Sequence, residues 1–329
     1  MMKTVVHSSG QLVCAFLLLF DSSASSQHNR AQTAAPVEAI RFKQNPIISE
    51  QSNGRIGNNI NGPSLITVPT WLAKPLGRYY LYFAHHTGDC IRLAYANKLE
   101  GPWTVYEPGT LKLPDTICSG HIASPDVHID NEKRELRMYF HGPVSGSQRQ
   151  VSLVATSKDG IHFTASKEVL GDSYFRVFQW RGFYYAMARL GVMYRSRDGL
   201  KDFEPGPNPF QVDSTPSRVR HVALKLDGDT LSIFYSRLGD NPESILLSKI
   251  ELSPDWRRWR ASEPTAILKP ETEYEGVNLP PAPSKEGPAP GRVRELRDPA
   301  IFREGGKDYL LYSVAGESGI AISTLKTGR

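Results

Sequence analysis

The feature that most constrains the fold is a unit that recurs about five times along the chain, once in roughly every 50 residues. Each unit contains an apolar stretch, a short turn, a second apolar stretch rich in Tyr, and then a loop. The second stretches span residues 79–84, 136–140, 183–188, 231–236 and 309–313. A repeat of this length built only from short strands predicts an all-β fold, a five-bladed β-propeller in which each unit is one blade.

Polar loops rich in His, Arg or Asp follow four of these second strands, and a loop with one Glu follows the fifth. They span residues 85–89, 141–143, 189–191, 237–240 and 314–317. In a propeller the equivalent loops of all blades converge on one end of the central axis, so residues far apart in sequence meet in one pocket. The repeat therefore predicts both the fold and the position of a candidate active site.

The propeller is predicted to be a single domain over residues 39–329. The last unit shows no outer strand after Leu325, so residues 40–48 are expected to supply it and to close the ring, which removes an open sheet edge. Residues 270–294 fit no blade and form a long irregular insertion rich in Pro and Glu. Such an insertion is either a functional lid or a simple surface crossover, and the sequence leaves both open.

The N-terminus has the pattern of a secretory signal peptide over residues 1–24, followed by a flexible polar lead-in over residues 25–38. Lys3 gives a weakly basic start, residues 12–20 are apolar, and small residues at 22–24 offer a cleavage site. The apolar run is too short to span a bilayer, so no membrane span is predicted; an uncleaved anchor is the alternative. The protein is therefore expected to be secreted or periplasmic.

Charge and cysteine content narrow the classes of partner. The net charge of +5 is spread along the chain without a basic run, which argues against a nucleic-acid partner, and no protein partner is evident. Cleavage of the signal would leave Cys90 and Cys118, which either form one disulfide or stay as two buried thiols. No spacing of Cys and His suggests zinc, so no metal ligands are predicted.

The strand starts and loops at the predicted pocket end carry many ionisable groups. The carboxylates are Asp89, Asp126, Asp240, Asp298 and Glu317, the imidazoles are His85, His86, His141 and His221, and the guanidinium groups are Arg176, Arg189, Arg220, Arg237 and Arg297. Two carboxylates across a pocket can catalyse glycoside hydrolysis, since one protonates the leaving oxygen and the other activates water or attacks directly. Arginines beside them can bind a carboxylate or sulfate of a substrate. Structural roles stay open too: Asp126 can cap a turn, and Arg297 with Asp298 can form an internal salt bridge.

Three motifs resemble those of a known group: Arg-Asp-Pro at residues 297–299, Glu-Gly-Pro-Trp at 100–103, and Lys-Asp-Gly at 158–160. Together with the blade pattern, they resemble the five-bladed propeller glycoside hydrolases, the group that includes families 32, 43, 117 and 130. The resemblance covers nearly all of residues 40–325 and implies a carbohydrate substrate. Some members of this group bind calcium in the tunnel near a histidine of the fourth blade, a position that His221 matches; no other cofactor is implied.

The acid/base residues of family 43 are not in place. That family has an Asp at each of its first two inner strands and a Glu at the third, whereas this chain has Asn-Gly-Pro at 61–63, an Asp displaced by two residues at Asp126, and no Glu near Ser173. We therefore predict a rearranged set, with Asp298 as base or nucleophile and Glu317 or Asp126 as acid. The predicted substrate-binding residues are Asn61, His85, His86, Asp89, His141, Arg176, Arg220, His221, Arg237 and Arg297.

The function predicted first is an exported glycoside hydrolase that acts on an oligosaccharide or polysaccharide. The arginines suggest that this substrate is acidic, a uronate or a sulfated sugar. A polysaccharide lyase on the same scaffold is the first alternative, because a His- and Arg-rich pocket also suits proton abstraction beside a neutralised carboxylate. A glycan-binding propeller without catalysis is the second.

Overall fold

The computed structural model of the chain describes residues 37–53, 55–211, 215 and 217–327. The predicted signal peptide and the lead-in up to residue 36 lie outside these residues. The described part of the lead-in, residues 37 and 38, already belongs to the first strand.

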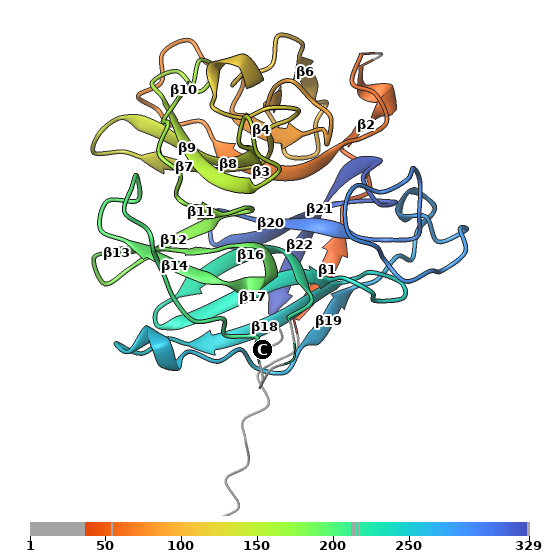
Figure 1. Cartoon of the computed structure of the whole chain (residues 1–329). Coiled ribbons are helices and arrows are strands. Elements are labelled where there is room, and N and C mark those ends of the chain that lie inside the picture. Colours follow the sequence, from red (N-terminus) through yellow and green to blue (C-terminus); the bar gives the residue numbers. More distant parts are fainter. Residues whose placement is uncertain (1–36, 54, 212–214, 216, 328–329) are drawn as a thin grey trace, which may run out of the picture. The chain divides into compact units, whose positions relative to one another are not determined.

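Five antiparallel sheets confirm the predicted five-bladed propeller (Figure 1). From the inner to the outer strand, blade one is β3 (Asn61–Thr67), β4 (Tyr79–Ala84), β5 (Arg92–Ala96) and β6 (Thr104–Tyr106). Blade two is β7 (Ala123–Asp130), β8 (Glu135–Pro143), β9 (Gln150–Ser157) and β10 (Thr164–Ala165), with the short β11 (Gly171–Asp172) also paired to β9. Blade three is β12 (Arg176–Trp180), β13 (Phe183–Met187), β14 (Met193–Ser196) and β15 (Glu204–Pro205). Blade four is β16 (Val219–Asp227), β17 (Thr230–Arg237), β18 (Ile245–Glu251) and β19 (Thr265–Leu268).

Blade five closes the ring with strands from both ends of the described chain. Its inner strands are β20 (Arg297–Glu304), β21 (Lys307–Ser313) and β22 (Gly319–Thr327). The outer positions are filled by β1 (Val37–Arg41) and β2 (Ile48–Ser49), which both pair antiparallel with β22. The predicted closure is therefore confirmed, and it leaves β22 paired along both of its edges.

The hydrophobic core is divided among the spaces between neighbouring blades. Tyr82 of blade one packs with Met138 of blade two in one cluster, and equivalent clusters join the other four pairs of blades around the ring. A polar contact repeats with this packing. The Tyr82 hydroxyl donates to the Gly160 carbonyl, and the Tyr139 hydroxyl of the next blade donates to the Gly199 carbonyl, both at 2.8 Å. Gly160 has a positive φ of 75°, and a Cβ there would lie 2.9 Å from a Leu136 methyl carbon, so the turn requires glycine.

Four of the five inner strands begin with a β-bulge. The register shifts between Asn61 and Ser64, between Ala123 and Asp126, between Val219 and Val222, and between Arg297 and Ala300. In three of them the second bulge residue has a positive φ and precedes a proline: Gly62, Ser124 and Asp298. Bulges re-aim side chains and are frequent beside active sites. The shared pattern makes Ser124, and not Asp126, the blade-two equivalent of Asp298.

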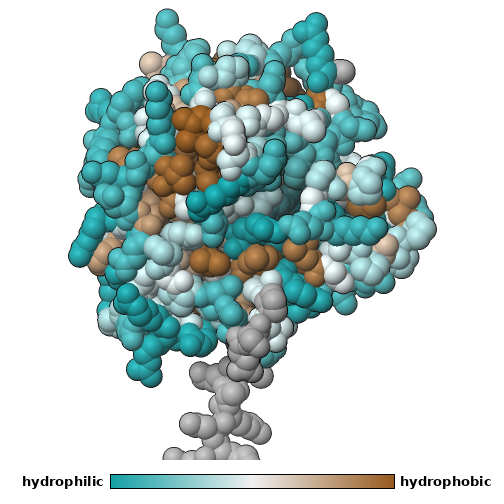
Figure 2. Space-filling view, viewed as in Figure 1, coloured by the Kyte–Doolittle hydropathy of each residue, from teal (hydrophilic) through white to brown (hydrophobic). Residues whose placement is uncertain are grey.

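The surface is mostly hydrophilic on the face shown in Figure 2, where apolar residues form small separate areas. Among the described residues, the large hydrophobic side chains classed as exposed are Ile40, Leu76 and Val169. No helix in the described part of the chain is long and apolar enough to cross a membrane. Cys118 is buried, Cys90 is partly buried, and both are free thiols in the structure, although the sequence had left a disulfide open.

Candidate active site

A cavity of about 660 Å³ lies at the end of the propeller where the loops after the second strands converge. Four blades and the insertion between β19 and β20 contribute to its wall. The lining residues used below are His86, His121, Arg149, Asp172, Tyr174, Arg189, Arg220, Glu286 and Gly287. We call this cavity the axial pocket. The insertion is therefore not a surface crossover remote from the site, because its residues 286–288 form part of the pocket wall.

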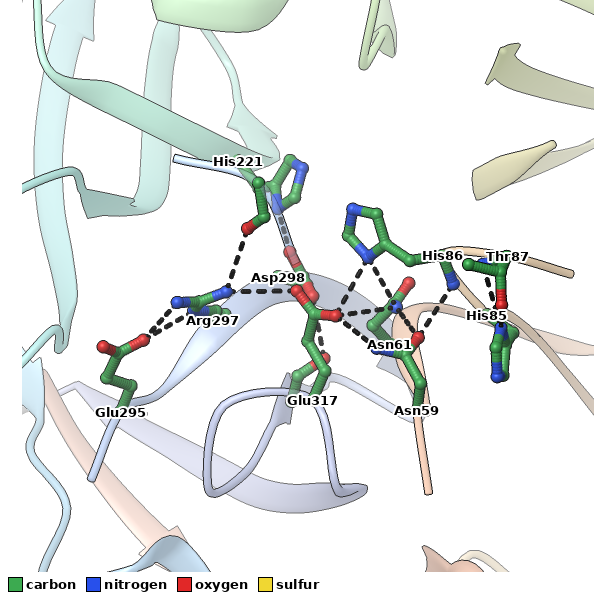
Figure 3. Close-up of polar contacts among 12 residues, drawn as sticks. Asn59, Asn61, His85, His86, Thr87, His221, Glu295, Arg297, Asp298 and Glu317 are labelled. Atoms are coloured by element: carbon green, nitrogen blue, oxygen red, sulfur yellow. Dashed lines mark hydrogen bonds and ion pairs between the residues drawn. The ribbon is translucent and has the colours of Figure 1, made fainter. Parts of the chain in front are cut away.

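A histidine–carboxylate pair lies at the edge of this pocket (Figure 3). The Nδ1 atom of His86 is 2.9 Å from Oε2 of Glu317, although the two residues are 231 positions apart in sequence. The Asn59 side chain donates to the same oxygen at 2.6 Å, and Asn61 lies within hydrogen-bonding distance at 3.4 Å. Because a carboxylate accepts only, His86 donates from Nδ1, which leaves Nε2 available to the pocket.

Glu317 is held in its ionised form. Its side chain is only 2% exposed, and Arg297 donates to its other oxygen at 3.1 Å. Although burial raises the pKa of Glu317, the hydrogen bond and charge of His86 and the charge of Arg297 lower that pKa to about 2. A carboxylate of this kind has no proton to donate near neutral pH, so the geometry argues against the predicted role of Glu317 as general acid.

A buried charge network continues from Glu317 behind the pocket. Arg297 donates to Glu295 from Nε at 2.8 Å and lies 3.4 Å from Glu243. Arg220 lies 3.6 Å from Glu243 and donates to the main-chain carbonyls of Lys285, at 2.7 Å, and of Gly287. Burial raises the pKa of the Glu243 carboxyl, which the two arginines oppose. The two arginines thus serve the network and the insertion, so neither is free to bind substrate as predicted.

Three aromatic rings are packed together at the axial pocket, one of them from the lining residue Tyr174. The ring of Tyr174 lies between those of His141 and His221, with centroid distances of 4.0 and 4.1 Å. Burial lowers the pKa of both imidazoles well below the usual range, so both histidines are neutral. Nδ1 of His221 contacts Oδ1 of Asp298, and the Ser313 hydroxyl donates to Oδ2 at 3.0 Å.

This environment supports neither a calcium site nor the predicted nucleophile. Within the described residues, no group of three or more His, Cys, Asp or Glu side chains is placed to hold a metal ion. Calcium takes six to eight oxygen ligands, and the His221–Asp298 pair does not supply them. Asp298 itself is 2% exposed and engaged with His221 and Ser313, which argues against its predicted role as base or nucleophile.

Several predicted residues lie outside the described wall of the axial pocket. Asp126 accepts from His128 at 2.8 Å and from the Val177 amide at 2.9 Å, joining blades two and three, and these donors lower its pKa although burial raises it. The prediction of Asp126 as an acid is therefore not supported. Arg237 is bound to Asp240 at 3.0 Å.

The remaining predicted residues have local structural partners. Nδ1 of His85 accepts from the Thr87 amide at 2.9 Å, and the main-chain carbonyl of Asp89, not its carboxylate, accepts from the Leu113 amide at 2.7 Å. Arg176 is buried and donates to the Ser124 carbonyl at 3.0 Å. Of the predicted site residues, His86 and Arg220 are found in the described pocket wall, with Asn61, Glu317 and Arg297 directly behind it. Arg189, which the sequence placed only among the ionisable groups at this end, also lies in the wall.

Sequence reasoning missed other residues of this region, namely Asn59, His121, Arg149, Asp172, Tyr174, Glu243 and Glu286. Glu243 lies in the loop that follows the second strand of blade four, three residues beyond the stretch considered. Extending each polar loop to the start of its third strand would have found Glu243 and Arg149. Glu286 could not be predicted from the blade pattern, because it lies in the irregular insertion.

Comparison with known proteins gives one sequence relationship and many structural ones. No protein-family model matches the chain. The chain is 39% identical over 315 residues to the "Uncharacterized protein R118" of Acanthamoeba polyphaga mimivirus, a match that covers 86% of this chain and 88% of that protein.

Solved structures that resemble it include glycoside hydrolases of low sequence identity. A glycosyl hydrolase from Bacteroides ovatus superposes with a TM-score of 0.61 at 13% identity, covering 88% of this chain and 93% of that chain. CoXyl43, a GH43 β-xylosidase/α-arabinofuranosidase from a compost microbial metagenome, gives 0.58 at 14% identity, covering 88% and 94%. A structure from the GH130 family of mannoside phosphorylases, which contains glycoside hydrolases that target β-1,2 mannosidic linkages in Candida mannan, gives 0.60 at 12% identity, covering 89% and 94%. These similarities show a shared fold and confirm the predicted structural resemblance.

Proposed function

The chain belongs to the same family as the mimivirus protein R118, and from the geometry of its axial pocket we propose that it is a glycoside hydrolase acting on an oligosaccharide or polysaccharide. The fold shared with glycoside hydrolases of families 43 and 130 supports this proposal at the level of the scaffold. The observation that carries it is the His86–Glu317 pair at the pocket wall. A buried, ionised carboxylate fixes the imidazole orientation and stabilises a positive charge on the ring when the ring carries two protons.

In this proposal His86 is the general acid. Its Nε2 proton is transferred to the glycosidic oxygen as the bond from that oxygen to the anomeric carbon breaks. A water molecule forms the new bond to the anomeric carbon and gives its proton to Asp172, a carboxylate in the same pocket wall. Glu317 positions His86 throughout. The roles predicted for Asp298, Glu317 and Asp126 are thereby replaced by His86 and Asp172.

A lyase mechanism is favoured by one specific observation, the presence of Tyr174 and Arg189 in the same wall as His86. In a lyase, His86 would abstract the proton beside a uronate carboxylate neutralised by Arg189, and the Tyr174 hydroxyl would protonate the leaving oxygen. The products separate the two reactions, because elimination leaves an unsaturated uronate that absorbs in the ultraviolet whereas hydrolysis does not.

The test is a substrate screen of the purified protein against neutral and acidic oligosaccharides, following reducing ends and ultraviolet absorbance together. His86→Gln is the test variant. His128→Gln is the matched control, because His128 also pairs with a carboxylate but lies outside the described wall of the axial pocket. New reducing ends without absorbance, lost only in His86→Gln, support the hydrolase. Absorbance moves the assignment to a lyase, and sugar binding without turnover in the wild type favours the glycan-binding alternative.

Export is a separate part of the proposal and rests on the signal-like pattern of residues 1–24. Expression of the full-length chain in a host with a secretory pathway should give a processed protein outside the cytoplasm. An unprocessed protein in the cytoplasmic fraction would contradict export without bearing on the activity.

A further inference from the structure

We infer that the rim of the axial pocket contains a subsite for an anionic group of the substrate, a carboxylate or a sulfate, and that Glu286 occupies this subsite in the free protein. The inference rests on the proposed function and names the substrate class of the same pocket. It depends on the difference between the buried and the exposed arginines at this end of the propeller.

The buried arginines are already committed to partners within the protein. Arg220 is 7% exposed and donates to two main-chain carbonyls of the insertion, and Arg297 is 1% exposed and pairs with Glu295 and Glu317. Turning either guanidinium group toward a ligand would leave buried carbonyls or carboxylates without partners, which is strongly unfavourable. These two residues therefore hold the pocket together and do not recognise the ligand.

Two exposed arginines in the pocket wall are different. The Arg189 side chain is 40% exposed and pairs with Glu286, which is 70% exposed; the Arg149 side chain is 66% exposed and lies 3.6 Å from Asp172. Exposed ion pairs contribute little to stability, so an anion from solution can replace Glu286 at Arg189 at small cost. A guanidinium group also presents paired donors that match a carboxylate or sulfate.

The insertion is built so that the Glu286 side chain can leave Arg189 while its backbone stays in place. The carbonyls of its neighbours Lys285 and Gly287 both accept from Arg220. The main chain on either side of Glu286 is thus fixed, and the exposed side chain alone needs to rotate away. Glu286 therefore serves as an internal substitute for the anionic group that Arg189 binds in a substrate.

The experiment measures the affinity of the full-length protein for D-glucuronate, glucose 6-sulfate and D-glucose by NMR titration. The wild type should bind the two anions more tightly than glucose. Arg189→Gln should lower the affinity for the two anions by about tenfold and leave the affinity for glucose unchanged. Glu286→Gln should raise the affinity for the two anions by about twofold to fivefold, because the carboxylate that competes with them for Arg189 is removed.

Matched controls separate a local effect from a change of net charge. Arg181 and Asp229 form an exposed pair at 3.1 Å, outside the described wall of the pocket, so Arg181→Gln and Asp229→Asn make the same charge changes elsewhere. Equal binding of anionic and neutral sugars, or equal effects of the test and control variants, would overturn the inference. Cleavage of a neutral oligosaccharide that still requires His86 would leave the proposed function standing in that case.

Discussion

Two histidine–carboxylate pairs in this molecule have nearly the same contact distance and very different surroundings. His86 and Glu317 are 2.9 Å apart, and His128 and Asp126 are 2.8 Å apart. Glu317 also interacts with Asn59, Asn61 and Arg297, and its histidine borders the axial pocket of about 660 Å³. Asp126 has the Val177 amide as its further donor, and its histidine borders a cavity of about 230 Å³.

The comparison shows that a close histidine–carboxylate contact does not by itself indicate catalysis. The pair at Glu317 is part of a charge network that fixes the carboxylate from several sides, and His86, whose Nδ1 is bound to this carboxylate, lines the axial pocket. In the other pair, Nε2 of His128 donates its hydrogen bond to Asp126. The same carboxylate accepts from the Val177 amide and so joins blades two and three. The difference between the two pairs can be tested by making the same changes in both.

The largest expected effect is on turnover. His86→Gln should lower kcat by about 10²–10⁴-fold, the usual contribution of general acid–base catalysis, whereas His128→Gln should stay within about twofold of wild type. Both variants are measured on the substrate that the screen identifies, with circular dichroism to show that each is folded. A comparable loss in both variants would mean that the pairs do not differ as we propose.

The next effect is on stability in acid. The pKa of Glu317 falls from its usual value of 4.5 to about 2 on folding, so its ionised form contributes stability above pH 4.5 that is lost as the pH falls toward 2. The shift corresponds to a contribution on the order of 3 kcal/mol. Urea unfolding of wild type and Glu317→Gln at pH 7, 4 and 3 checks this. The variant should lose less stability between pH 7 and pH 3 than the wild type, and parallel losses would contradict the assignment.

A smaller effect is expected on catalysis when Glu317 is changed and His86 is kept. Glu317→Gln should lower kcat by about tenfold to a hundredfold, the range found for groups that orient a metal-bound histidine through its other ring nitrogen. A purely structural role for Glu317 would leave the pH profile of kcat unchanged, whereas loss of the partner of His86 should shift it. Asp126→Asn is the control and should leave both kcat and its pH profile as in wild type.

The positions of the strands could be predicted because the pattern of apolar stretches and polar loops repeats along the sequence. The Tyr-rich second strand was predicted at residues 79–84 and is found as β4 (Tyr79–Ala84), and the ring closure by the N-terminal segment is found as β1 and β2. The convergence of loops brought His86 and Glu317 to one place, since blade geometry alone requires it.

The roles within the site could not be predicted in the same way. Whether an arginine meets a substrate or a carbonyl depends on the path of the insertion, and residues 270–294 have no periodicity that fixes that path. Arg220 was therefore predicted to bind substrate, although it holds Lys285 and Gly287. The bulge at Asp298 was present in the sequence as a residue before proline, repeated at Gly62 and Ser124, but its meaning depends on the register, which only the structure shows.

The smallest expected effect comes from another histidine–carboxylate pair, which lies on the surface. His162 and Asp159 are 2.7 Å apart, with side chains 83% and 48% exposed, and the pKa of Asp159 is also lowered to about 2 even though partial burial raises it. Because solvent screens this exposed pair, Asp159→Asn should change the free energy of unfolding by less than about 1 kcal/mol and should leave turnover unchanged. Urea unfolding at pH 7 beside Glu317→Gln measures the contrast. If Asp159→Asn lowered the free energy of unfolding as much as Glu317→Gln, burial and the charge network would not be what distinguishes Glu317.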